Sequence, residues 1–114
     1  MTSRKVTYST TFIDQLLAFT DSGEQEYGER VAQEKKNRVF DFFDITIAAT
    51  PHIKRRHPKL GLVVYPVSKT PFIVIYDYDD HEVQVFACLK KGAGTRLTDF
   101  DIESVEWRSM TEPV

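Results

Sequence analysis

The stretch PHIKRRHPKLGLVVYPVSKTPFIVIYDYDDHEVQVFACL, residues 51–89, decides the fold. A basic loop opens it, and three runs rich in β-branched and aromatic residues follow, separated by turn sequences. Such runs are typical of strands, and short polar turns between them predict an antiparallel meander. We expect the three strands at residues 62–67 (LVVYPV), Phe72 to Tyr78 (FIVIYDY) and Glu82 to Leu89 (EVQVFACL).

The residues within these runs predict the place of each strand. Pro66 has no amide hydrogen, so the first strand is expected at a sheet edge or a bulge. The second run is almost entirely apolar at its start, which predicts a central strand covered by helices on one face. The third run alternates in polarity and size, so we expect one face to be formed by Val83, Val85, Ala87 and Leu89.

The chain before this stretch begins with a predicted strand and a short helix. Lys5 to Tyr8 has β-branched and aromatic residues and no helix signal. The hydroxyl residues 9–11 offer N-caps for a helix that ends near Phe19. Asp21-Ser22-Gly23 is then expected to break it.

A second, longer helix is predicted up to Pro51. Ser22 and Gln25 have the spacing of a capping box, which places the start of this helix at Ser22. Pro51 ends it, because the residue before a proline disfavours the α region. Its apolar side is expected to repeat every four residues, at Tyr27, Val31, Lys35, Val39, Phe43 and Ile47.

The predicted fold class is therefore α+β: a strand, a helical hairpin and then a three-stranded antiparallel sheet, with the first strand added at the sheet edge. We expect one domain over residues 1–98 and an acidic extension over residues 99–114. Within the extension, DFDIESVEW is expected to form a short strand or helix. Trp107 is expected to anchor either to the domain or to a partner.

Charge is distributed unevenly along the 114 residues, whose net charge is −2. Residues 51–98 carry 8 basic and 4 acidic side chains, whereas residues 99–114 carry 1 basic and 5 acidic ones. A basic middle beside an acidic tail favours a polyanion or an acidic protein as partner, although scattered solvated charge is the simpler alternative. No apolar run is long enough to span a bilayer, and no secretory signal is visible. The single cysteine fits a reducing cytoplasm.

Basic side chains form the main candidate site. They cluster in the loop after Pro51 and recur after the third strand. Arg and Lys at this density suit contact with phosphate or with carboxylates of a protein target, and a solvated loop is the alternative interpretation. The candidate target or phosphate contacts are Lys54, Arg55, Arg56, His57, Lys59, Lys90, Lys91 and Arg96.

Other reactive side chains receive structural interpretations. His52 and His81 fall in turns without a carboxylate at metal-ligand spacing, so we expect neither a metal nor another cofactor. The acidic residues 77–82 surround a hairpin turn, where Asp is favoured for backbone hydrogen bonding. Cys88 lies within a strand and is expected to be a packed thiol.

The order of these segments resembles the RelE/ParE superfamily, the toxins of type II toxin–antitoxin systems. The resemblance covers roughly residues 5–90: a strand leading into YSTTFIDQLLAF, a long helix ending at Pro51, a basic loop with HPKLG, then VVYPV, IVIYDY and VQVFACL. It implies a bacterial cytoplasmic toxin, of the kind associated with growth inhibition and plasmid stabilization, that a cognate antitoxin neutralises. RelE-like members cut mRNA on the ribosome, whereas ParE-like members poison DNA gyrase.

Two departures from the cleaving members favour the ParE-like alternative. Those members carry an arginine on the strand that corresponds to LVVYPV and a histidine or tyrosine near the end of the final strand. Here the matching residues are Val63 or Val64, and Lys90. We therefore expect no catalytic residue and a toxin that binds an essential target, with DNA gyrase as the expected one.

Two alternatives stay open. A RelE-like ribosome-dependent endoribonuclease could use a rearranged basic set of Lys54, Arg55, Arg56, Lys90 and Arg96. A degenerate member could bind its antitoxin without harming the cell, which the acidic net charge favours because proteins that approach nucleic acid are commonly basic.

Overall fold

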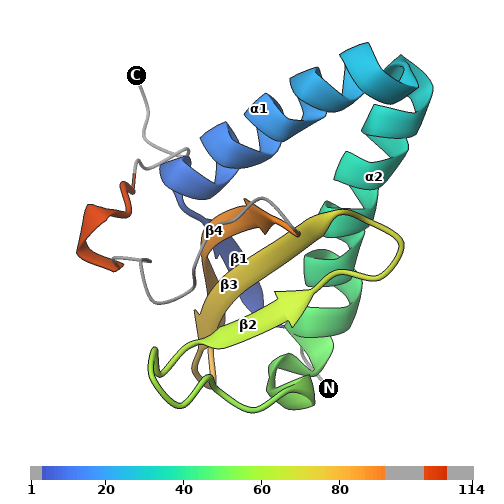
Figure 1. Ribbon diagram of the computed structural model, residues 1–114. Helices are drawn as coiled ribbons and strands as arrows, with labels where there is room; N and C mark the ends of the chain where they lie inside the picture. Colours follow the sequence, from blue (N-terminus) through green and yellow to red (C-terminus); the bar gives the residue numbers. More distant parts are fainter. Residues whose placement is uncertain (1–3, 92–101, 108–114) are drawn as a thin grey trace, which may run out of the picture.

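The computed structural model describes residues 4–91 and 102–107 (Figure 1). The elements follow one another as β1 (Lys5–Tyr8), α1 (Thr10–Tyr27), α2 (Glu29–Asp41), a π-helical segment (Phe42–Ile47), a 3-10 turn (Pro51–Ile53), β2 (Val63–Pro66), β3 (Phe72–Tyr78), β4 (Glu82–Lys90) and a second 3-10 turn (Ile102–Ser104).

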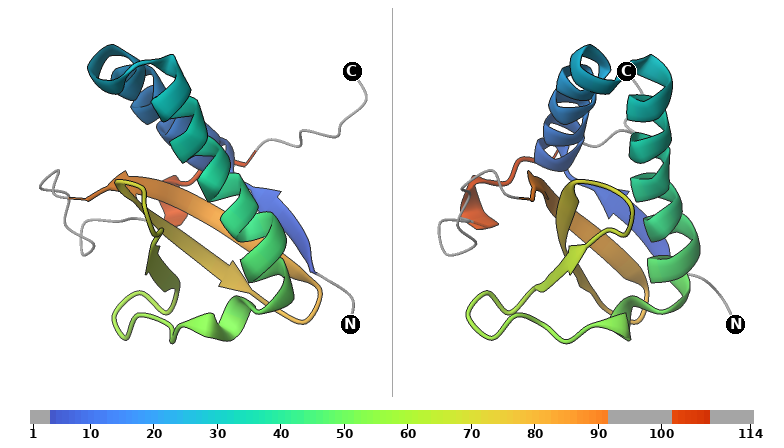
Figure 2. Two further views of the ribbon diagram at one scale, coloured as in Figure 1. Left: turned by 90° about the vertical axis from the view of Figure 1, so that its right-hand side faces the viewer. Right: turned by 45° about the vertical axis from the view of Figure 1, so that its right-hand side comes forward.

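The four strands form one sheet in the order β1-β4-β3-β2. β2, β3 and β4 are the expected antiparallel meander, and β1 pairs in parallel with β4 at the far edge. The helices cover one face, and the second 3-10 turn lies on the opposite side of the sheet (Figure 2). The α+β class, the edge position of the first strand and the edge position of the strand that contains Pro66 are all confirmed.

The start of α1 is fixed to the sheet by one hydroxyl group. Ser9 is the N-cap: its Oγ accepts a hydrogen bond from the Phe12 amide at 2.9 Å and donates one to the Phe86 carbonyl at 2.6 Å. Ser9 is fully buried, so both hydrogen bonds are shielded from water. The expectation of an N-cap within residues 9–11 is confirmed.

The predicted break at Asp21-Ser22-Gly23 is wrong, and so is the capping box at Ser22. α1 continues through these residues to Tyr27, and the hairpin turns at Gly28, whose φ of 89° favours glycine. A Cβ built on Gly23 would lie 3.6 Å from that of Ala32, an ordinary van der Waals distance, so α1 and α2 lie side by side here without requiring glycine. Glycine within a helix costs roughly 1 kcal/mol relative to alanine, and burial of Phe12 and Leu16 on the same helix offsets this cost.

The predicted apolar side of the second helix is correct only in its C-terminal half. Val39, Phe43 and Ile47 are fully buried, whereas Tyr27 and Val31 are 57% and 38% exposed. A repeat of four residues overshoots the α-helical turn by roughly 40° each time. The wider π-helical turn at Phe42–Ile47 absorbs this drift and keeps the last three positions on the sheet.

The predicted alternation of the third strand of the meander is wrong beyond Val85. Ile75 pairs with Ala87 and Tyr76 pairs with Val85, so Phe86 is an extra residue in β4. A β-bulge of this kind exchanges the faces of the residues that follow it. Cys88 therefore packs on the helix-covered face, as a buried thiol, while Phe86 and Ala87 belong to the opposite face.

Two hydrophobic clusters lie on the two faces of the sheet. The larger lies beneath the helices, and its fully buried side chains include Phe12, Phe43 and Tyr76. The smaller lies on the other face, where Leu62, Val64, Ile75, Phe86, Ala87 and Val105 are buried together.

The C-terminal residues 102–107 contribute to this smaller cluster. Val105 is buried in it, and the Trp107 ring packs edge-on against Phe86 with centroids 5.4 Å apart. The Glu106 carbonyl accepts hydrogen bonds from the Thr10 and Thr11 amides at the start of α1. Of the two expectations for Trp107, the structure shows the anchor to the domain.

Candidate functional site

The basic loop between the first 3-10 turn and β2 is folded back on itself. The His57 amide donates to the Leu62 carbonyl at 2.7 Å, and the Gly61 amide donates to the His57 carbonyl at 2.8 Å. The Lys59 amide donates to His57 Nδ1 at 3.2 Å. Gly61, with φ of 71°, allows the tight reversal. The loop is thus held against the start of β2 by its own backbone.

Arg56 fastens this loop to the end of β3. Its Nε and Nη2 atoms donate to Asp77 Oδ1 at 3.2 and 3.0 Å, and Nη2 also donates to the Tyr78 carbonyl at 3.1 Å. The guanidinium carbon lies 4.4 Å from the centroid of the Tyr78 ring. The hydrogen bond to Asp77 raises the pKa of Arg56 above its ordinary value. Arg56 therefore has a structural role that its sequence position did not reveal.

The neighbouring cations are exposed. Lys54 Nζ lies 5.8 Å from the Tyr65 ring centroid, and Arg55 and Lys59 point into solvent. Among the residues that the structure describes, none of these three cations forms an ion pair. Lys54 and Arg55 line an open groove of about 730 Å³, together with Ile53, Arg56, His57, Pro58 and Val64, and Lys59 follows the last loop residue of this lining in the chain.

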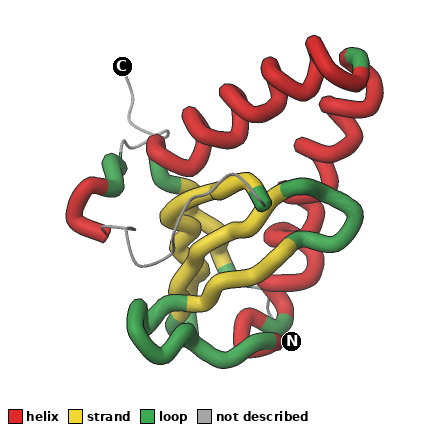
Figure 3. Tube along the Cα trace, viewed as in Figure 1, coloured by secondary structure: helices red, strands yellow, loops and turns green. Residues whose placement is uncertain are grey.

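Lys90 and Lys91 lie at the opposite end of the sheet. Lys90 pairs with Phe72 at the start of β3, whereas Arg56 is bound at the end of this seven-residue strand. A strand of this length spans roughly 20 Å at about 3.3 Å per residue. Figure 3 shows the loops at these two ends. The predicted basic set is therefore divided, and Arg96 lies outside the described residues.

Both lysines at this end contact the fold itself. Lys91 Nζ donates to the Thr70 carbonyl at 3.0 Å and closes the turn between β2 and β3. Lys90 lines a small space beneath the helical hairpin, beside Phe19 and Tyr27. Lys91 is exposed, but its amino group is engaged by the turn, so the cations without a hydrogen-bond partner among the described residues of this set include the lysines of the loop before β2.

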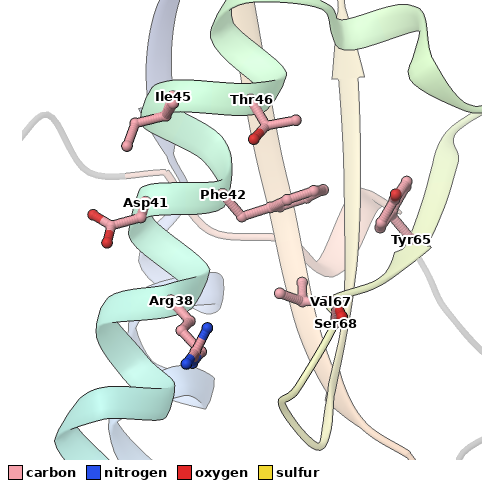
Figure 4. A pocket seen from close by; sticks show the side chains of 8 residues that line it. All are labelled: Arg38, Asp41, Phe42, Ile45, Thr46, Tyr65, Val67 and Ser68. Carbon is pink, nitrogen blue, oxygen red and sulfur yellow. The ribbon is translucent and has the colours of Figure 1, made fainter.

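A second groove, missed by the sequence interpretation, lies between the π-helical segment and β2 (Figure 4). Phe42 points from the helix toward Tyr65, with ring centroids 4.8 Å apart. The groove of about 410 Å³ is lined by Arg38, Asp41, Phe42, Ile45, Thr46, Tyr65, Val67 and Ser68. The sequence signal for this groove was Ile45, an apolar residue outside the four-residue repeat. In the structure its side chain is 70% exposed.

Asp79 and Cys88, two further reactive groups, are accounted for by the fold. Asp79 Oδ1 accepts from the His81 and Glu82 amides at 2.7 and 2.8 Å, and these bonds lower the pKa of Asp79. Burial raises the pKa of the Cys88 thiol to about 12. Val63 and Val64, 0% and 7% exposed, belong to the clusters on the two faces of the sheet.

Two further features of the described residues bear on the site. In residues 4–91 and 102–107, no three His, Cys, Asp or Glu side chains lie close enough together to hold a metal ion. No helix within the same residues has the length and apolar character needed to cross a membrane.

Comparison with known proteins shows a likeness in fold to a solved structure. No protein-family model and no curated protein matches the chain. A solved structure described as the chromosomal ParDE TA system from P. aeruginosa contains a similar chain, with a TM-score of 0.67 and 12% sequence identity. The match covers 78% of this chain and 97% of that one. The protein therefore has the fold of a chain from a toxin–antitoxin system.

Proposed function

We propose that this protein is the toxin of a type II toxin–antitoxin system, that it arrests growth by binding an essential target, and that a cognate antitoxin neutralises it. The observation that carries the proposal is the shared fold, which extends over nearly the whole of the ParDE chain. The segment order that resembles RelE/ParE toxins supports the same assignment. The proposed setting is the bacterial cytoplasm.

The environment of the basic residues favours binding over RNA cleavage. Cleavage needs a cation at the phosphate and groups that transfer protons. Val63 and Val64, one of which is expected to match the arginine of the cleaving members, are buried apolar residues. His57 Nδ1 accepts a backbone hydrogen bond, and Arg56 is engaged by Asp77. Because the groups that cleavage needs are replaced or already engaged, these contacts favour a surface that binds a partner.

DNA gyrase is the target to test first, because the departures from the cleaving members favour the ParE-like alternative. In this proposal Lys54, Arg55 and Lys59 contact the target. Arg56 and His57 hold the loop that presents them.

Controlled expression in bacteria tests the proposal. Without antitoxin, we expect growth arrest with altered plasmid supercoiling and intact mRNA. Transcripts cut within codons would instead support the endoribonuclease alternative, and unimpaired growth would support a non-toxic, antitoxin-binding member. Co-expression of a short open reading frame beside the gene should restore growth if that frame encodes the antitoxin.

A further inference from the structure

The basic groove has the chemistry of a site for one class of partner. We propose that it binds an acidic protein segment that carries an aliphatic side chain between its carboxylates. The assignment of this segment to the growth-arrest target rests on the proposed function. The chemistry of the groove is argued from its own residues.

Unpaired positive charge is the first argument. Lys54, Arg55 and Lys59 are exposed and have no carboxylate partner among the described residues. Asp77, at the end of β3, already accepts two hydrogen bonds from Arg56. An incoming segment with two or more carboxylates would supply the missing counter-charges.

The groove also has an apolar part. Ile53 is 47% exposed, which is high for a large aliphatic side chain, and Val64 and Pro58 line the same hollow. An aliphatic side chain of the partner would cover Ile53 and gain about 25 cal/mol for each Å² of apolar area removed from water. Charge and apolar surface therefore lie within one groove.

The loop is ordered before a partner arrives. The bonds between His57 and Leu62, between His57 and Lys59, and from Arg56 to the end of β3 fix the segment that directly follows Lys54 and Arg55. A partner that binds a fixed loop loses less free energy to ordering than one that must organise a flexible loop.

The same surroundings disfavour a single-stranded nucleic acid. Such ligands rely on free aromatic rings for base stacking. The two rings beside the loop are Tyr65 and Tyr78, and each already has a cation over its face, from Lys54 and Arg56.

Fluorescence anisotropy with a labelled synthetic peptide of glutamates and leucines tests this inference on the full chain. We expect saturable binding that weakens at about 1 M salt, where the Debye length is about 3 Å. Replacing the glutamates of the peptide by lysines should abolish binding, and replacing its leucines by serines should weaken it. A labelled oligouridylate should bind more weakly than the acidic peptide.

Matched variants locate the contact. Lys54→Gln with Arg55→Gln should weaken peptide binding roughly tenfold, which corresponds to about 1.4 kcal/mol. Arg30→Gln with Lys36→Gln removes the same charge from α2 and should leave binding unchanged. Ile53→Ser should weaken binding, whereas Ile45→Ser, at the exposed isoleucine of the other groove, should not.

Specific results overturn the inference. Equal losses in the two charge-removed pairs would mean that net charge alone attracts the peptide. Tighter binding of oligouridylate would mean that the groove serves a nucleic acid. Peptide binding without any effect on growth would contradict the proposed function and leave the inference standing. Growth arrest without peptide binding would contradict the inference and leave the proposed function standing.

Discussion

The two faces of the sheet are built differently. The helix-covered face is a closed aromatic core, in which the Phe43 ring packs against Tyr8, Phe12 and Tyr76 with centroids 5.6 to 6.0 Å apart. The opposite face is covered by loop residues and by a short C-terminal segment, and Trp107 there remains 42% exposed. The basic groove borders this second face through Val64.

The helix-covered face stabilises the fold, whereas the opposite face borders the groove that we propose as the binding site. Aromatic contacts from α1, the π-helical segment and β3 hold the fold, so their side chains are unavailable to a partner. The second face is framed by connections that hold a few apolar residues and present charge. Loops placed on a rigid scaffold are where binding residues commonly lie.

Cys88 gives the largest expected effect, because it reports whether the helix-covered face is closed. Burial raises the pKa of this thiol, so much less thiolate is present near neutral pH than for an ordinary cysteine. Alkylation by iodoacetamide, followed by mass spectrometry, should be slow in the folded protein and rapid in urea. Rapid alkylation of the folded protein would show that this face opens.

Phe43→Ala should cause the largest loss of stability. A fully buried aromatic residue replaced by alanine leaves a cavity that costs about 3–5 kcal/mol. Urea denaturation followed by circular dichroism measures the loss. A change below about 1 kcal/mol would contradict the view that this ring holds the helices on the sheet.

A matched pair of valines compares the faces directly. Val39→Ala removes a fully buried side chain beneath the helices, and Val105→Ala removes one that is 9% exposed on the other face. We expect a loss of about 2 kcal/mol for the first and about 1 kcal/mol for the second. Equal losses in denaturation experiments would remove the distinction between the two faces.

Arg56→Ala should cost about 1 kcal/mol. The variant loses its hydrogen bonds to Asp77 and Tyr78, but its side chain is 43% exposed, so water replaces part of the interaction. Amide hydrogen exchange should become faster in the loop after Pro51 and stay unchanged beneath the helices. Unchanged exchange in the loop would argue against a fastening role.

Lys54→Gln with Arg55→Gln should change stability least, by less than about 0.5 kcal/mol, because both side chains are exposed. Thermal unfolding of the double variant measures this. A large drop in the melting temperature would assign these cations to the fold instead of to a partner.

The sequence predicted the elements whose signals are local. The strand at Phe72 to Tyr78, the edge strand with Pro66 and the cap at Ser9 follow from apolar runs, a missing amide hydrogen and a hydroxyl. The hairpin turn at Gly28 was missed, because α1 runs on through a polar stretch while packed against α2 and β4, and local sequence signals do not show that packing. The bulge at Phe86 was also missed, since it depends on the register between β3 and β4.

The candidate site was also predictable only as far as its signals are local in the sequence. Cation density identified the loop, but it could not distinguish Arg56, which is bound to Asp77, from Arg55, which is exposed. It also placed Lys90 with the loop, although a whole strand separates them. Only the fold sets these distances.

A supercoiling assay with purified gyrase tests the central claim, that this protein acts by binding a target through its basic loop. The account predicts that the intact protein inhibits supercoiling and that Lys54→Gln with Arg55→Gln, folded and equally stable, does so much less. Full supercoiling activity at saturating concentrations of the intact protein would contradict it.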